Sequence, residues 1–143
     1  MSEHNSESLN EAISLLKDGV TIAIVNGERL VTSNERGIKF VLGLVESGDD
    51  ILNGASIADK VVGRAAALLM VKGGVKEVYA EVLSIPAQEV FLKYGVECEY
   101  KTLVQGIINR KGDGQCPMEK AVLGIDSPSE AAKVLREKLN IIN

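Results

Sequence analysis

The chain has 143 residues, of which 45% are hydrophobic and 25% charged, and its formal net charge is −4. An acidic chain lacks the basic stripe of a phosphate-backbone binder, and 3% of aromatic residues leaves few rings to stack on single-stranded nucleic acid. The length fits one domain, which at this size buries about 68–70% of its unfolded surface. We therefore predict a single domain over residues 1–143, with residues 1–6 as a flexible tail.

Cysteine use and the lack of long apolar runs predict where the protein is found. Cys98 and Cys116 are too few for a disulfide framework, which is typical of a reducing compartment. The stretch from Met1 to Glu11 is polar and acidic, unlike a signal peptide, and no apolar run approaches the ~18 residues of a membrane helix. We expect a cytoplasmic protein that binds neither a membrane nor a nucleic acid polymer.

In the first half of the chain, turn residues and capping residues predict the elements. Asn26-Gly27 lies between two strand-like runs, which is the strongest short-range signal for a hairpin. Ser56 and Asp59 have the spacing of a capping box, which predicts that a long helix begins there. In order, we predict a helix from Ser6 or Ser8 to about Lys17, strands over 20–25 and 28–32, a helix over 38–46 and a helix over 57–72.

The second half alternates strands and helices before it ends in two helices. In order, we predict a strand over 75–82, a helix over 84–94, strands over 96–100 and 103–109, a helix from 117 to about 123 and a helix over 128–139. Alternation implies parallel strands joined by right-handed crossovers, and the hairpin must supply one antiparallel neighbour. The predicted fold is α/β: a three-layer α-β-α sandwich around a mixed sheet of about five strands.

The loop before Pro117 is the first candidate site. Pro117 suits the first position of a helix, so Cys116 is predicted as its N-cap and Glu119 as a carboxylate that reaches back to free donors of the same helix. Asn109, Arg110, Gly112 and Gly114 precede this helix and could embrace an anion, or they form an ordinary surface turn. The thiol of Cys116 is either reactive or simply a small, half-buried side chain.

Three charged residues form the second candidate site. Asp59 and Lys60 are predicted at a helix N-terminus beside the carboxyl ends of the strands, where open α/β sheets bind ligands. Glu81, at the end of the strand over 75–82, is expected nearby. The alternative for Asp59 is purely structural, as the partner of Ser56 in the capping box. Cys98 alternates with apolar neighbours in a strand, so we predict that it belongs to the core.

Two segments are distinctive, G-A-S-I-A-D-K-V-V-G-R-A-A-A over 54–67 and N-R-K-G-D-G-Q-C-P-M-E-K-A-V over 109–122. Together with the hairpin they resemble a prokaryotic family of unknown function whose fold is similar to the cytidine deaminases. Zinc deaminases use His or Cys before Glu on one helix and Pro-Cys-x-x-Cys on the next. Here Ile57-Ala58-Asp59 and Pro86-Ala87-Gln88-Glu89-Val90 stand in those places, and the one histidine, His4, lies in the tail. The resemblance thus implies a deaminase-like fold without the usual zinc ligands, and we expect no metal or cofactor.

These observations favour binding of a small anionic metabolite, with a nucleotide-like compound first, in a pocket lined by Asp59, Lys60, Arg110 and Cys116. If the protein is an enzyme, Cys116 is the expected nucleophile and Asp59 the proton carrier. Two alternatives stay open. One is a catalytically inactive fold that serves as a regulatory or homo-oligomerising module. The other is a divergent zinc-dependent hydrolase with Cys116, Asp59 and a residue of a neighbouring chain as ligands.

Overall fold

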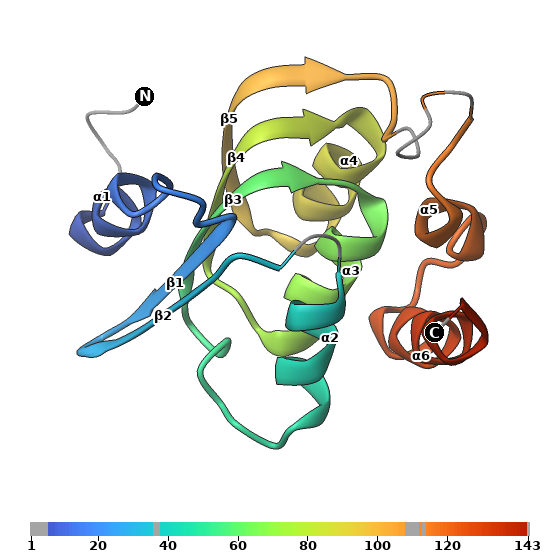
Figure 1. Cartoon of the computed structure of the whole chain (residues 1–143), viewed down its shortest axis with the longest axis horizontal. Helices are drawn as coiled ribbons and strands as arrows, with labels where there is room; N and C mark the ends of the chain where they lie inside the picture. Colours follow the sequence, from blue (N-terminus) through green and yellow to red (C-terminus); the bar gives the residue numbers. More distant parts are fainter. Residues whose placement is uncertain (1–5, 36–37, 108–111, 113, 143) are drawn as a thin grey trace.

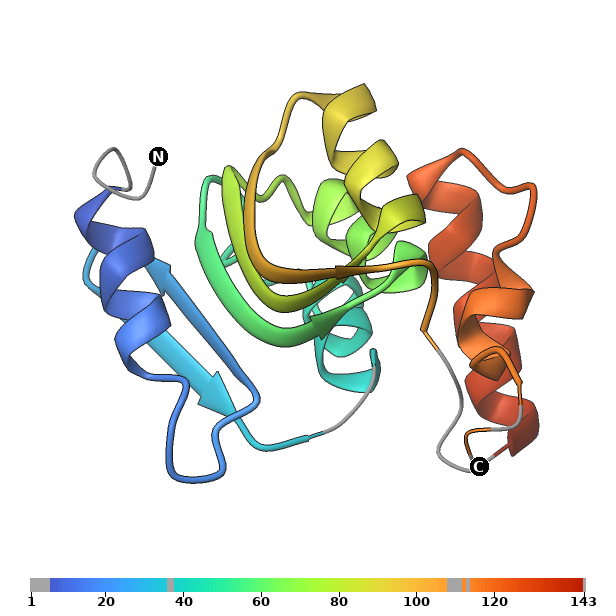
Figure 2. The ribbon, with the colours of Figure 1, turned by 90° about the horizontal axis from the view of Figure 1, so that it is seen from above.

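The computed structural model describes residues 6–35, 38–107, 112 and 114–142. Its centre is a mixed five-stranded sheet, with α1 on one face and the other helices on the opposite side (Figures 1 and 2). This arrangement confirms the predicted α/β sandwich. The elements are α1 (Glu7–Ser14), β1 (Ile22–Asn26), β2 (Arg29–Ser33), α2 (Lys39–Glu46), β3 (Ser56–Val62), α3 (Arg64–Gly73), β4 (Glu77–Ser84), α4 (Ile85–Tyr94), β5 (Glu97–Val104), α5 (Pro117–Ala121) and α6 (Pro128–Ile142).

The sheet has the strand order β2-β1-β3-β4-β5. β1 is antiparallel to both β2 and β3, with Ile24 opposite Val31 on one side and Ile57 on the other. β3, β4 and β5 are parallel, with Ile57, Val78 and Cys98 side by side. The hairpin therefore supplies the antiparallel neighbour, and α3 and α4 are the crossovers, as predicted.

The two faces of the sheet bury different side chains. On the face that α1 covers, small residues such as Ala12, Ala23 and Ala58 let the helix lie close to β1 and β3. On the opposite face, large side chains from the remaining helices, such as Leu42, Phe91 and Leu135, form the main core. We call these the α1 face and the helix-layer face. No helix in the described part of the chain is long and apolar enough to cross a membrane.

The predicted helix over 57–72 is wrong in its first turns. Residues Ser56–Val62 are the central strand β3, and the helix begins only after Gly63, at Arg64. The hydroxyl of Ser56 does not cap a helix; it is buried and donates to the Glu77 carboxylate at 2.5 Å. Because β3 pairs with a strand on each side, sheet hydrogen bonding outweighs the local capping-box pattern.

The last part of the sheet also differs from the prediction. Instead of two strands over 96–100 and 103–109, there is one strand, β5, from Glu97 to Val104. The number of five strands is nevertheless right, because β3 takes the place of the surplus strand. β5 pairs with β4 on both sides of Lys101, from Glu97 to Tyr100 and from Thr102 to Val104, so it continues as one strand.

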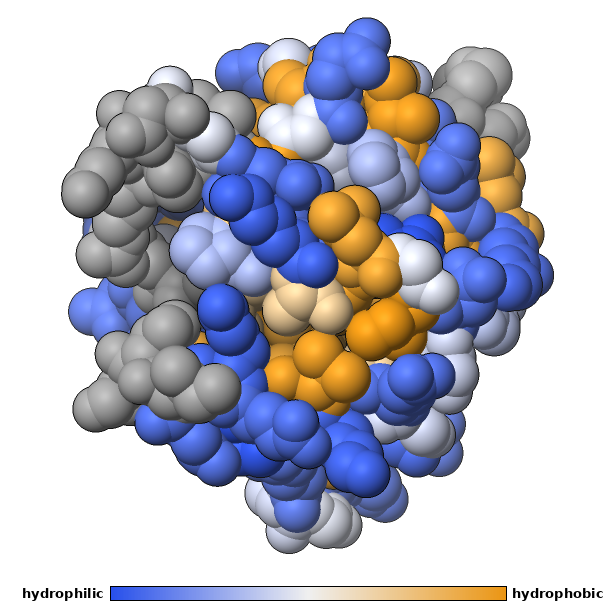
Figure 3. All heavy atoms as spheres, turned by 90° about the vertical axis from the view of Figure 1, so that its right-hand side faces the viewer, coloured by the Kyte–Doolittle hydropathy of each residue, from blue (hydrophilic) through white to orange (hydrophobic). Residues whose placement is uncertain are grey.

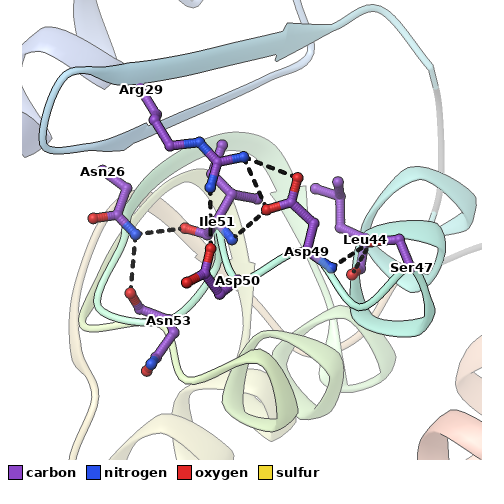
Figure 4. Close-up of polar contacts among 8 residues, drawn as sticks. All are labelled: Asn26, Arg29, Leu44, Ser47, Asp49, Asp50, Ile51 and Asn53. Carbon is purple, nitrogen blue, oxygen red and sulfur yellow. Dashed lines mark hydrogen bonds and ion pairs between the residues drawn. The ribbon is translucent and has the colours of Figure 1, made fainter.

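A network of polar contacts attaches the loop before β3 to the hairpin (Figure 4). The Arg29 guanidinium donates to both carboxylate oxygens of Asp49, at 2.8 and 2.9 Å, and to Asp50 at 3.1 Å. The side-chain amide of Asn26 donates to the carbonyl oxygens of Ile51 at 2.7 Å and Asn53 at 2.9 Å. These contacts hold the amino-terminal end of β3 in register with β1.

Candidate functional site

The turn between β3 and α3 is closed by a buried carboxylate from a distant part of the chain. Glu119, which is 6% exposed, accepts hydrogen bonds from the backbone N–H groups of Arg64 at 2.7 Å and Ala65 at 2.8 Å. Gly63 makes this approach possible, because a Cβ there would lie 2.4 Å from Glu119 Oε1 and 2.8 Å from Ile107. The prediction that Glu119 caps its own helix is therefore wrong: it caps α3, whose free donors face it across the glycine.

The side chain of Arg64, in turn, binds acceptors at the end of α5. It reaches past the end of α5 and donates to the carbonyl oxygens of Val122, at 3.4 Å, and Ile125, and to the Asp126 carboxylate at 2.9 Å. A carboxylate at a helix N-terminus and a cation at a helix C-terminus both complement the helix dipole. The start of α3 and the end of α5 thus cap each other.

Asp59 is the middle residue of β3 and does not lie at a helix N-terminus. It is opposite Ile22 of β1 and beside Ala80 of β4, which places it on the helix-layer face. Its side chain is mostly buried, and burial raises its pKa to about 7, although the backbone N–H groups of Val61 and Lys60 favour the charged form. Burial therefore favours the neutral form of the Asp59 carboxyl group.

Lys60 and Glu81 lie on the other face of the sheet. Successive residues of a strand point to opposite faces, so Lys60 follows Asp59 onto the α1 face. Glu81 follows Ala80 in the same way. Burial, and after it the charges of Glu81 and Glu99, raise the pKa of Tyr79. The prediction that Asp59 and Lys60 lie together at a helix N-terminus is wrong, because both belong to β3, where neighbouring residues point to opposite faces.

Cys116 is the N-cap of α5, as predicted, with Pro117 at the first helical position. It is half-buried against the main core, and its backbone N–H donates to the Ile107 carbonyl at 2.9 Å. This contact brings Cys116 to the side of the turn that Gly63 and Glu119 occupy. In the loop before it, Gly112 is exposed and Gly114 is half-buried. The remaining predicted loop residues, Asn109 and Arg110, lie outside the described residues.

The two cysteines are expected to react with iodoacetamide at very different rates. Burial, with a smaller effect of Glu99, raises the pKa of Cys98 to about 12, so little of its thiolate exists at pH 8. We expect Cys116 to be alkylated at least about tenfold faster than Cys98 in the folded protein. Peptide mass spectrometry over a time course measures both rates, with Cys116→Ser as the control. Equal rates in the native protein would contradict this assignment of Cys98 to the core.

Other features of the described surface do not coincide with the predicted site residues. A hollow of about 520 Å³ lies between residues 18–20, the end of β2 and Phe40. Among the described residues, no three His, Cys, Asp or Glu side chains lie close enough together to hold a metal ion. The side of the molecule that carries α5 and α6 shows apolar side chains within a hydrophilic surround (Figure 3). Leu92 on α4 and Leu123 after α5 are 75% and 63% exposed.

Comparisons with known proteins assign a family. A solved structure from Thermotoga maritima, described as a DUF1893 family protein (TM1506), is 30% identical with a TM-score of 0.81, covering 94% of this chain and 92% of that one. A Thermotoga maritima diaminohydroxyphosphoribosylaminopyrimidine deaminase/5-amino-6-(5-phosphoribosylamino)uracil reductase is 14% identical with a TM-score of 0.46, covering 82% of this chain and 40% of that one. No curated protein matches significantly. The family model described as TM1506, domain of unknown function (DUF1893), matches residues 11–139, and the chain belongs to this family.

Proposed function

We propose that this protein binds a small anionic metabolite, nucleotide-like in class, between Asp59 in the middle of β3 and the carboxyl ends of the parallel strands, with Asp59 as the proton-carrying group. The observation that carries the proposal is the mostly buried Asp59, which accepts a hydrogen bond from the backbone N–H of Val61 at 3.4 Å and pairs with no cation among the described residues, so that burial raises its pKa to about 7. Burial destabilises the charged form of a carboxyl group, and carboxyl groups with raised pKa values are concentrated at functional sites. The carboxyl ends of the strands are also where open α/β sheets bind ligands.

The neutral form of Asp59, which burial favours, suits an anionic ligand. A neutral carboxyl group donates a hydrogen bond to an anionic oxygen, whereas a carboxylate repels it. The loop that ends at Cys116 is the second part of the proposed site, because it meets the β3–α3 turn through Ile107. Backbone donors at Gly112 and Gly114, with Asn109 and Arg110, are the proposed ligand contacts. In a catalysed reaction Cys116 would be the nucleophile.

We also propose that the fold is similar to that of the cytidine deaminases. Its support is the order of the elements: a helix, a hairpin, and then helices and strands in alternation as far as β5. The positions that open α3 and α4 carry Arg64-Ala65 and Ile85-Pro86-Ala87, which are not metal ligands. The chemistry that we propose therefore uses the Asp59 carboxyl group and the Cys116 thiol. Metal analysis of protein purified without chelator tests the zinc-hydrolase alternative, which requires stoichiometric zinc.

The first experiment is a thermal-shift screen with nucleotides, nucleosides and sugar phosphates at pH 6 and pH 8.5. A ligand at about 100 times its dissociation constant adds roughly 2.7 kcal/mol, a shift of several degrees for a domain of this size. If binding needs the neutral carboxyl group, affinity falls about tenfold per pH unit above 7. Asp59→Asn, which stays neutral, should bind equally at both pH values. A ligand whose affinity ignores both pH and this substitution would refute the role of Asp59.

Two further variants locate the ligand. Lys60→Ala changes the α1 face, and Cys116→Ser changes the loop on the helix-layer face. The proposal expects weaker binding only for the loop variant. If Lys60→Ala alone weakens binding, the ligand occupies the α1 face and the proposed site is wrong.

The second candidate function is a binding module without catalysis. It is favoured by the apolar side chains left exposed on the α5–α6 side of the molecule (Figure 3), where Leu123 is 63% exposed. If the protein melts cooperatively but no compound in the thermal-shift panel raises its melting temperature, this candidate is favoured.

A further inference from the structure

β5 is an open edge of the sheet. It forms the outermost strand at the top of Figure 1, and among the described residues only those of β4 pair with it. It is eight residues long, from Glu97 to Val104, and contains neither proline nor glycine. Tyr100 and Leu103 on this strand are 41% and 37% exposed. An edge strand with unpaired N–H and C=O groups is a template for a further strand.

We propose that two copies of this chain pair through β5, antiparallel, about a two-fold axis at Tyr100. In such a pair every residue faces the residue equally far from the axis on the partner. Glu99 then lies opposite Lys101 of the second copy, and Lys101 opposite its Glu99. Opposite charges across an antiparallel pair are favourable. The result is one continuous sheet of two five-stranded halves.

The charges select this register over its neighbours. With the axis at Glu99, Lys101 would face Glu97 of the second copy, but the two Glu99 carboxylates would face each other at the centre of the pair. With the axis at Lys101, two ammonium groups would do so. Like charges directly opposite are unfavourable. Only the axis at Tyr100 pairs both charges with their opposites, and it also places two partly exposed aromatic rings together, which is a favourable cross-strand pair.

The occupant is therefore a second copy and not an unrelated strand. Charged residues on an edge commonly prevent pairing, lysine above all. In β5, Glu99 precedes Tyr100 and Lys101 follows it. When a second copy of the strand runs in the opposite direction, each glutamate therefore faces a lysine. Pairing through β5 does not depend on the proposed ligand. A monomer that binds the ligand and a dimer that binds none are different outcomes, and the thermal-shift screen and the ultracentrifugation tell them apart.

Charge reversal tests the pairing by analytical ultracentrifugation of the full chain. Glu99→Lys and Lys101→Glu each place like charges opposite one another twice, so we expect a dissociation constant at least about tenfold above that of the wild type. The doubly substituted Glu99→Lys/Lys101→Glu protein keeps the composition and restores both pairs, and it should dimerise again. A wild type that is monomeric at roughly 100 μM would overturn the proposal. So would folded single variants that dimerise as the wild type does, or a double variant that stays monomeric.

A crosslink at the axis tests the register itself. In a chain with Cys98→Ser and Cys116→Ser, the substitution Tyr100→Cys places two thiols opposite each other. Opposite Cα atoms in an antiparallel pair are about 4.5–5.5 Å apart, within the range of a disulfide. We expect rapid formation of a disulfide-linked dimer under mild oxidation. The matched control is Glu97→Cys, which faces Leu103 and should crosslink at least about tenfold more slowly. Equal crosslinking of both variants would refute the axis at Tyr100.

Discussion

Replacing Glu119 with alanine is expected to lower the free energy of unfolding by about 2–4 kcal/mol, since two N–H groups at the start of α3 lose a charged acceptor. The Glu119 side chain is buried, so water does not replace it fully. Urea unfolding followed by circular dichroism measures the loss. The control is Glu137→Ala on the exposed side of α6, which should change stability by less than about 0.5 kcal/mol. Similar stabilities for the two variants would show that the contact contributes little.

A double-mutant cycle with Gly63 tests the geometry of this contact. Gly63→Ala alone should destabilise by about 1–3 kcal/mol, because the new methyl group must displace the Glu119 carboxylate and Ile107. When Glu119 is already alanine, the carboxylate is no longer there to be displaced. The double variant should therefore lose less than the sum of the single losses, with a coupling of about 1 kcal/mol or more. Additive losses would mean that Gly63 and Glu119 do not interact.

Asp59→Asn is expected to stabilise the protein at pH 8 by about 2–4 kcal/mol and to leave it nearly unchanged at pH 4. The pKa of Asp59 is about 7 in the folded protein, against an ordinary value of 3.8. The folded state therefore holds this proton more tightly, and its contribution to stability is present below pH 4. As pH rises from 4 to 7 the contribution is lost, and above 7 the loss is complete.

The measurement is the difference in unfolding free energy between this variant and the wild type, from urea titrations at intervals between pH 4 and pH 8.5. Taking the difference cancels the titration of the other groups. Glu11→Gln, at an exposed position of α1, is the control and should give a nearly flat difference. A flat difference for Asp59→Asn as well would show that Asp59 is not desolvated, and would remove the main support for its role in the proposed site.

Capping and turn signals predicted most of the elements correctly. Ser6 caps α1, Ser84 caps α4, and Cys116 with Pro117 begins α5. These features depend on hydrogen bonds and backbone angles among residues a few positions apart, so the local sequence is sufficient. The hairpin around Asn26-Gly27 is another local signal, and the structure confirms it.

Local signals failed where a distant partner decides the conformation. Ser56 and Asp59 have the spacing of a capping box. However, the Ser56 hydroxyl donates to the Glu77 carboxylate, and the backbone of this segment pairs with β1 on one side and β4 on the other. The change from helix to strand also changed the candidate site. On one end of a helix Asp59 and Lys60 would be neighbours, whereas in β3 they point to opposite faces.

The amino-acid sequence by itself determined the fold class, the caps and the hairpin, since periodicity and short-range hydrogen bonds specify them. Only the tertiary structure decided which carboxylate meets which donors. Glu119 caps α3 from 54 and 55 positions away, and the reason is a glycine at the turn that leaves room for it. It also decided that Asp59 is desolvated, because that depends on the strands and helices packed around it and not on its neighbours in the chain.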